Sequence, residues 1–257
     1  MTDHVRVVLE QGVLIVTLNR ADKKNALSNA MYAALAEALA RAESDSAVRV
    51  VVLQAEGDSF TAGNDLADFA AVATGTMPRG EMKSGLFLSA LARAQKPLVA
   101  AVQGQAVGIG VTMLLHCDLV YVAEDARLST PFVNLGLVPE AASSLLLPAR
   151  IGYARAYQMF ALGEPIDGRT AAQIGIATAA VPAGSLQATA LAAAKKLTSK
   201  PIAALKAMKA LVRDAELIQA TMNRESEVFG ARLKGPETAE ALLAFAQKRA
   251  PDFSKFS

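Results

Sequence analysis

A glycine-rich segment in the middle of the chain carries the clearest sign of chemistry. Residues 97–102 form a short β-rich run, Gly104, Gly108 and Gly110 follow it directly, and residues 111–116 can begin a helix. The first turn of a helix has backbone N–H groups without intrahelical partners, and they point outward at the positive end of the helix dipole. A strand, a tight turn and a helix start in this order therefore predict a site for an anion or a dipole.

The same segment has two other interpretations. Its GxxxGxG spacing is like the nucleotide loop of short-chain dehydrogenases, and Glu124, 20 residues after Gly104, stands where a ribose-binding acid would lie. Against a dehydrogenase, the loop follows two earlier strands that the nucleotide fold has no place for, and no tyrosine is followed four residues later by a lysine. Close packing of backbone against backbone is the remaining alternative.

Composition narrows the class of protein. The 26 Lys and Arg residues against 24 Asp and Glu leave a net charge of +2, so no strong field points to nucleic acid or to an anionic membrane. A single cysteine, Cys117, excludes an internal disulfide framework, and two histidines are too few for a histidine metal cluster. The N-terminus has charges where a signal peptide would be apolar, and the uncharged run 97–117 contains several Gly and Gln residues. We expect a cytoplasmic protein without metal or membrane insertion.

Short β-rich runs alternate with helical patterns along much of the chain. Ser28 is a plausible N-cap for a helix with apolar residues at every fourth position. The strand signal disappears over residues 183–248, which read as helix with a break at Gly235 and Pro236. The alternation predicts an α/β architecture with functional loops at the strand ends. The predicted strands cover residues 5–9, 13–18, 48–53, 97–102, 118–122 and 176–181.

Several segments together resemble the crotonase, or enoyl-CoA hydratase/isomerase, family. They are residues 18–20 (LNR), 24–27 (KNAL), 60–66 (FTAGNDL) and 104–110 (GQAVGIG), and their order and spacing also match. The resemblance runs from about residue 5 to residue 253. It implies a spiral of repeated β-β-α units over residues 1–195. It also implies a C-terminal helical region over residues 196–257 that joins subunits into a homotrimer or a dimer of trimers.

The resemblance also implies the substrate and its contacts. The substrate is an acyl-coenzyme A thioester, with coenzyme A as part of the substrate and no separate cofactor. A thioester loses its α-proton only if fixed donors meet the charge that arrives on the carbonyl oxygen, and two backbone N–H groups do so without reorganising. By position, these donors are the amides of Ala62 and Ile109. The implied contacts to coenzyme A are Lys24, Asn25, Ala26, Ala62, Gly63, Asn64, Asp65, Leu66, Phe245 and Lys248, the last two often from a neighbouring subunit.

The reaction depends on which carboxylates are present. The family's hydratases use two glutamates, and the matching positions hold Thr112 and Phe132, neither of which can act as a carboxylate base. Residues 135–144 are similar to the 3-enoyl-CoA to 2-enoyl-CoA isomerases, in which the glutamate matching Glu140 is the base. The expected reaction is therefore isomerisation in fatty-acid or related acyl-CoA degradation. The alternative for Glu140 is a plain carboxylate that caps the helix it opens.

Other activities remain open on the same scaffold. They are an enoyl-CoA hydratase, an acyl-CoA thioesterase or decarboxylase, a non-catalytic acyl-CoA-binding protein and, remotely, the dehydrogenase. A released thiol would indicate the thioesterase, and a 3-hydroxyacyl product would indicate the hydratase. The helix expected around residues 82–91 should shape the acyl pocket.

Overall fold

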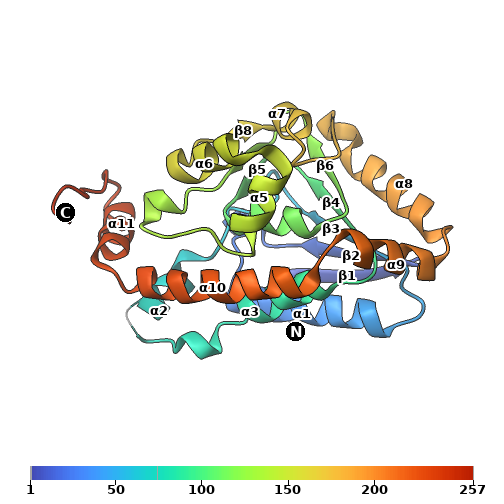
Figure 1. Cartoon of the computed structure of the whole chain (residues 1–257), viewed down its shortest axis with the longest axis horizontal. Coiled ribbons are helices and arrows are strands. Elements are labelled where there is room, and N and C mark those ends of the chain that lie inside the picture. The colour runs from blue at the N-terminus through green and yellow to red at the C-terminus, as the bar shows by residue number, and fades with distance from the viewer. Residues whose placement is uncertain (1, 74, 257) are drawn as a thin grey trace.

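The computed structural model describes residues 2–73 and 75–256 and contains two β-sheets surrounded by helices (Figure 1). The larger sheet has the order β1-β2-β3-β4-β6-β9, in which β1 and β2 are antiparallel and the other neighbouring pairs are parallel. The smaller sheet has the order β5-β7-β8. The strands are β1 Val5–Glu10, β2 Val13–Leu18, β3 Val50–Ala55, β4 Leu98–Val102, β5 Gln105–Val107, β6 Leu119–Ala123, β7 Arg127–Ser129, β8 Ile166–Asp167 and β9 Ala179–Val181.

Two helices begin where their capping residues predict. The Ser28 side chain accepts from the N–H of Met31 (3.4 Å) at the start of α1, and Pro236 lies in the first turn of α11 after Gly235. The helices are α1 Asn29–Ser44, α2 Leu66–Ala73, α3 Ser84–Arg93, α4 Ile109–Thr112, α5 Ser143–Ile151, α6 Tyr153–Leu162, α7 Gly168–Gln173, α8 Leu186–Thr198, α9 Ile202–Val212, α10 Ala215–Leu233 and α11 Pro236–Ala246.

The chain repeats one pattern as it passes through the two sheets. β4 of the larger sheet leads into β5 of the smaller sheet and then into α4, and β6 leads into β7 and later α5. After β3 the same step is shorter, because Thr61 forms a single parallel bridge with Ala106 of β5 before the chain enters α2. This repetition of strand, crossing strand and helix confirms the expected β-β-α spiral.

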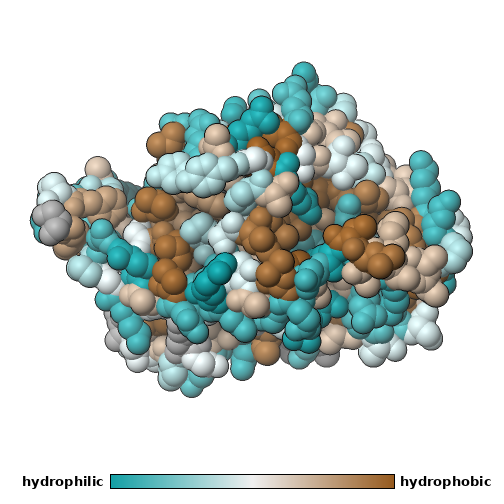
Figure 2. All heavy atoms as spheres, viewed as in Figure 1, coloured by the Kyte–Doolittle hydropathy of each residue, from teal (hydrophilic) through white to brown (hydrophobic). Residues whose placement is uncertain are grey.

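The C-terminal part, expected as helix over residues 183–248, consists of α8, α9, α10 and α11. α8 packs against β3, β4 and β6 of the larger sheet. The expected boundary between the two parts of the chain, at residues 195 and 196, falls in the last turn of this helix. α10 crosses the molecule beside α3 and α5 (Figure 1). Figure 2 shows apolar side chains gathered over α9 and above the line of α10. These helices therefore complete the body and also expose apolar surface.

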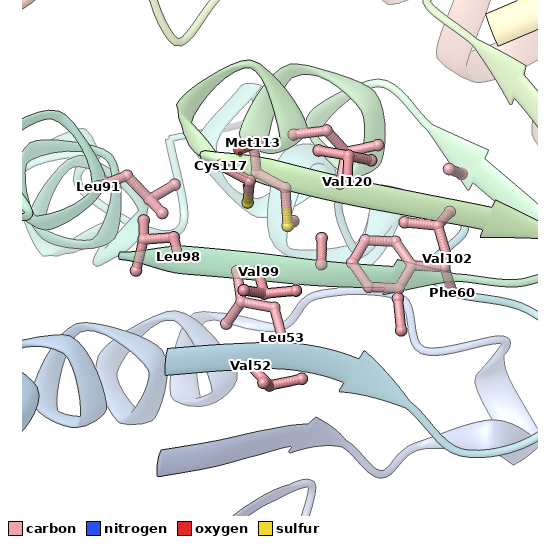
Figure 3. Packing of buried hydrophobic residues seen from close by; sticks show 14 of the residues in the cluster. Val52, Leu53, Phe60, Leu91, Leu98, Val99, Val102, Met113, Cys117 and Val120 are labelled. Atoms are coloured by element: carbon pink, nitrogen blue, oxygen red, sulfur yellow. Dashed lines mark hydrogen bonds between the residues drawn. The ribbon is translucent and has the colours of Figure 1, made fainter. Parts of the chain in front are cut away.

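The hydrophobic core lies around β3 and β4, which are buried along almost their whole length. Val52 and Leu53 of β3 lie beside Val99 of β4, with Met113 and Cys117 packed above them (Figure 3). Parallel strands covered on both faces read as continuous apolar runs, and each buried Val or Leu contributes about 1.5–3 kcal/mol. The loops that follow these two rigid strands carry the candidate site.

The strands predicted from β-rich runs all belong to the larger sheet, and the structure adds a second sheet that the sequence does not reveal. β5, β7 and β8 contain two or three residues each, which is too short for a periodic pattern. β9 is shorter than the predicted 176–181 run, and β3 begins two residues later than expected. Among the described residues no helix is long and apolar enough to cross a membrane, and no three His, Cys, Asp or Glu side chains are grouped as a metal site requires.

Candidate active site

Two loops that follow neighbouring strands are joined edge to edge and form the candidate site. After β3, Thr61 donates its backbone N–H to the carbonyl of Gln105 (3.0 Å) and accepts from the N–H of Val107 (3.1 Å). Gly110 allows this approach, because a Cβ atom there would lie 2.6 Å from Cγ2 of Thr61. The backbone of residues 62–64 is thereby held beside the start of α4, and both segments line one cavity.

The backbone N–H groups of these two loops differ in whether they have a hydrogen-bond acceptor within the protein. The N–H of Ala62 donates to the carbonyl of Lys24 (2.9 Å), so the expectation that Ala62 supplies an oxyanion donor is wrong. In the described residues, the N–H groups of Asn64 and of Ile109, the first residue of α4, have no acceptor. Both residues line the same cavity, of about 70 Å³. Asn64 and Ile109, one from each loop, therefore present two unpartnered amides to this cavity.

Residues 24–26, expected among the contacts to coenzyme A, brace the first loop, and their contact to coenzyme A stays a prediction. Asn25 is fully buried; its Nδ2 donates to two backbone carbonyls (both 2.8 Å), and its Oδ1 accepts from the N–H of Arg20 (2.7 Å). The Arg20 guanidinium donates to the carbonyl of Ala26 (2.9 Å) and to the carboxylate of Asp65 (2.6 Å). The side chains of Asn25 and Asp65 are thus committed to the protein itself. Of residues 24–26, only Lys24 is exposed.

Glu140 lies on the turn before α5 and borders a second cavity, of about 170 Å³, which Asn64 also lines. Its side chain is half-buried, and its Oε1 is buried without a hydrogen-bond partner in the described residues. The pKa of this carboxyl is raised from 4.5 to about 7, first by burial and then by the nearby Glu225 carboxylate, while Thr112 opposes the rise. The group can therefore take up or release a proton near neutral pH.

The hydrogen bonds at the start of α5 show that Glu140 does not cap this helix. The amides of Ala142 and Ser144 both donate to the carboxylate of Glu225 on α10, at 2.6 and 2.9 Å. Glu140 contributes only its backbone carbonyl, which accepts from the N–H of Ser143 (3.0 Å). The amides that a capping Glu140 carboxylate would accept from are thus already bound to Glu225. The alternative of a helix-capping Glu140 is therefore wrong.

The turn that carries Glu140 has an unusual backbone. Ala141 and Ala142 have φ values of 60° and 56°, in the left-handed region that residues other than glycine seldom adopt. The carbonyl of Ala141 lies 2.8 Å from Nε2 of His116, and Arg213 contacts the other ring nitrogen. Burial, followed by the Arg213 charge, lowers the pKa of His116 to about 3, so its ring is neutral, with Nε2 donating and Nδ1 accepting. The turn is thus held by contacts from distant segments.

Three further side chains surround the carboxyl group and the free amides. Thr112 is buried, and its hydroxyl lies near Glu140 without the geometry of a full hydrogen bond. Phe132 lines the first cavity. Tyr32 donates its OH to Oδ1 of Asn64; burial, followed by the charge of Glu140, raises its pKa well above the ordinary value. Neither position that matches a hydratase glutamate has a carboxylate, and Tyr32 is a contact that no sequence motif indicated.

The second cavity lies between α3 and α10. Met82 and Leu88 line it from the α3 side, while Met222 and Phe229 line it from α10. The helix expected around residues 82–91 therefore does contribute to this cavity, and α10 forms the opposite wall. Phe229 and Asn64 border both cavities, so a ligand with its carbonyl at the free amides can place its apolar chain between the two helices.

The C-terminal residues expected at coenzyme A are not brought to the site of their own chain. α11 borders the first cavity through Thr238 and Leu242. Phe245 is 64% exposed, Lys248 is also exposed, and neither lines this cavity. A role for them at coenzyme A stays a prediction that needs a neighbouring subunit. The expected contacts that do border the cavity are Ala62, Gly63, Asn64 and Leu66.

The fold and the site together define a class of protein. A carboxyl group with a pKa of about 7 next to two unpartnered amides is the arrangement needed to take a proton from carbon and to hold the oxyanion that results. Glu124, the acid that a nucleotide-binding loop would use, is paired with Arg169 (2.7 Å) at the surface. The arrangement can therefore support enolate formation, and Glu124 does not stand at this site as the acid of a dehydrogenase would.

Comparison with known proteins gives the family. A family model described as enoyl-CoA hydratase/isomerase matches residues 9–255, and the chain belongs to this family, whose members act on acyl-CoA thioesters. A crystal structure of an enoyl-CoA hydratase/isomerase from Pseudoalteromonas atlantica T6c is 42% identical, with a TM-score of 0.92 over 98% of this chain and 100% of that one. The resemblance found in the sequence is thereby confirmed.

Two curated relatives carry different activities. Enoyl-CoA delta isomerase 2 of Rattus norvegicus is 33% identical over 95% of this chain, which spans 64% of the length of the rat protein. The 2,3-dehydroadipyl-CoA hydratase of Escherichia coli is 34% identical over 95% of this chain and 96% of its own length. Because these relatives include both an isomerase and a hydratase, the reaction has to be argued from the side chains of this chain.

Proposed function

We propose that this enzyme isomerises 3-enoyl-CoA to trans-2-enoyl-CoA with Glu140 as the base. The observation that carries the proposal is the Glu140 carboxyl itself, whose buried Oε1 has no partner within residues 2–73 and 75–256 and whose pKa is about 7. Thr112 and Phe132 stand where a hydratase would have its glutamates. One free carboxylate suffices for moving a double bond, because the same group can remove a proton at C2 and return it at C4.

In this mechanism the backbone holds the negative charge. Removal of the C2 proton moves charge onto the thioester oxygen and gives a dienolate. The N–H groups of Asn64 and Ile109 are proposed to donate to that oxygen, since no acceptor in the described residues competes for them. Such donors need no reorganisation, because their loops are already joined by the hydrogen bonds of Thr61.

The proton balance follows from the pKa of Glu140. A pKa of about 7 keeps a large share of the carboxyl ionised at neutral pH and ready to accept the C2 proton. Once protonated, the same carboxyl is acidic enough to deliver the proton to C4 of the dienolate. No net proton is consumed, and the only bonds that change are two C–H bonds and the position of the C=C bond.

From the same assignment we propose a role in fatty-acid or related acyl-CoA degradation. We propose that coenzyme A extends from the first cavity toward α11 and that the acyl chain occupies the second cavity. A cytoplasmic location belongs to this proposal because the N-terminus is charged where a signal peptide would be apolar. A homotrimer or dimer of trimers is proposed from the resemblance to the family.

The second candidate function is hydration of 2-enoyl-CoA, favoured by the 34% identity to a hydratase from Escherichia coli. The deciding experiment incubates the protein separately with a short 3-enoyl-CoA and a short 2-enoyl-CoA and identifies the products by mass spectrometry. We expect conversion of the 3-enoyl to the 2-enoyl thioester. A 3-hydroxyacyl-CoA as the main product would replace the isomerase with the hydratase, and free coenzyme A thiol would indicate a thioesterase.

A further inference from the structure

Glu225 on α10 is a second carboxylate at the acyl cavity, and its contacts differ from those of Glu140. It is 7% exposed and borders the same cavity as Glu140. Its Oε2 accepts from the N–H of Ala142 (2.6 Å) and its Oε1 from the N–H of Ser144 (2.9 Å). Both oxygens therefore accept from the backbone that follows Glu140, whereas Oε1 of Glu140 has no partner in the described residues.

We propose that Glu225 is a positioning residue for the Glu140 base, because it clamps the turn at Ala142 and Ser144 and keeps a negative charge beside the base. The proposal builds on the proposed function, in which Glu140 moves the proton. Glu225 itself transfers no proton and touches no reacting atom.

The conformation of the turn shows why a clamp is needed. Ala141 and Ala142 both have positive φ, which alanine adopts only when the surroundings hold it there. His116 holds the Ala141 carbonyl from the core side, and Glu225 holds the Ala142 amide from the cavity side. With one of the two contacts removed, the turn can relax toward ordinary backbone angles. Such a relaxation would move the Glu140 carboxylate away from the free amides.

The charges around Glu140 support the proposal that Glu225 keeps a negative charge beside the base. Glu225 from α10 faces Glu140 and raises its pKa, as does burial, while Tyr32 from α1 and Thr112 from α4 are uncharged neighbours. The pKa of Glu225 is itself raised by burial, and the amides of Ser144 and Ala142 and the charge of Arg224 only partly offset that rise. In its ionised form, Glu225 makes Glu140 a stronger base.

The test compares three variants on α10 by two readouts. Glu225→Gln removes the charge and one acceptor, and Glu225→Asp keeps the charge but shortens the reach by one methylene. The matched control is Glu227→Gln on the exposed face of the same helix. The first readout is the pH profile of kcat for 3-enoyl-CoA isomerisation. The second is the titration of Glu140 by NMR with ¹³C-labelled glutamate, in which the signal lost from Glu140→Gln identifies the residue.

For Glu225→Gln we expect kcat to fall about 10- to 100-fold with little change in KM, since small misplacements of a catalytic group are costly. We expect the acidic limb of the profile and the Glu140 NMR titration to move to lower pH by about 0.5 unit or more. Glu225→Asp should lower kcat while its acidic limb stays near that of the wild type. Glu227→Gln should change neither.

Two results would overturn the proposal. One is a folded Glu225→Gln protein whose Glu140 signal titrates as in the wild type. The other, decisive even if the Gln variant does not fold, is a Glu225→Asp protein with wild-type kcat. The NMR titration needs no turnover, so it tests Glu225 even if the protein proves not to be an isomerase. In that case the wild type would lack isomerase activity, while the Glu140 titration would still shift in Glu225→Gln.

Discussion

At the scale of single residues, the raised pKa that makes Glu140 reactive also lowers the stability of the folded protein. Its pKa is about 7 in the folded protein against an ordinary 4.5, so the folded state binds more protons than the unfolded chain between these two pH values. The free energy of unfolding therefore falls as pH rises through that window, and the loss is complete above pH 7. Its upper limit is about 3 kcal/mol, and the partial solvent exposure of Glu140 reduces this value.

This leads to a prediction for Glu140→Gln. The amide cannot accept the C2 proton, so isomerisation should be abolished while thioester binding survives. The variant should also be more stable than the wild type, by a larger margin near about pH 8 than near about pH 5, because glutamine has no charge to bury. Turnover and melting temperature of one preparation measure both effects. A near wild-type rate would remove Glu140 as the base, and an equal gain at both pH values would contradict its raised pKa.

At the scale of elements, the start of α4 can be tested through its first residue. Ile109→Pro deletes the proposed donor N–H, and proline suits the first position of a helix, so the fold should survive. Ile109→Ala is the matched control, because it removes the same side chain but keeps the N–H. We expect the proline variant to lose about 100- to 1,000-fold in kcat relative to the alanine variant. Equal rates in two folded variants would exclude the Ile109 amide as a donor.

The contact between the two loops can be tested at Gly110. A β-carbon there would come within 2.6 Å of Thr61, so Gly110→Val should push apart the loops that carry the free amides. We expect turnover to fall by about 100-fold or more, as for loss of one oxyanion donor. Gly184→Val is the control, since a β-carbon at Gly184 meets nothing within 4 Å. Wild-type turnover in a folded Gly110→Val protein would show that the oxyanion site lies elsewhere.

These elements also show what can be predicted from sequence alone. The strands of the larger sheet and the position of Glu140 could be predicted, because β-rich runs and a short motif mark them in the local sequence. Which amides can serve as oxyanion donors depends on a contact between segments that are distant in sequence. The carbonyl of Lys24 accepts from the N–H of Ala62, whereas the N–H of Asn64 has no acceptor in the described residues. Glu225 gives no signal at all, because it is one charged residue on a helix, and only the fold brings it to Ala142, 83 residues away in sequence.

At the scale of the whole molecule, the C-terminal helices expose several large apolar side chains. Leu211 is 88% exposed and Val212 is 78% exposed at the end of α9, and Phe245 is 64% exposed on α11. Isolated exposed apolar residues are common, but neighbouring ones on the same helices are typical of surfaces that bind protein. We therefore propose that these helices join subunits and that Phe245 and Lys248 approach the coenzyme A site of a neighbour.

Deletion of residues 236–257 tests both parts of this proposal. α11 borders the first cavity through Thr238 and Leu242, so its removal should weaken coenzyme A binding at the site of its own chain as well as assembly. Light scattering after size-exclusion chromatography should show a smaller particle, and calorimetric titration with coenzyme A should show a higher Kd. Deletion of residues 251–257 alone is the control, because it leaves α11 whole, and it should keep assembly. A monomeric deletion protein that binds coenzyme A as tightly as the intact protein would contradict the proposal, because the cavity would then need neither α11 nor a neighbouring subunit.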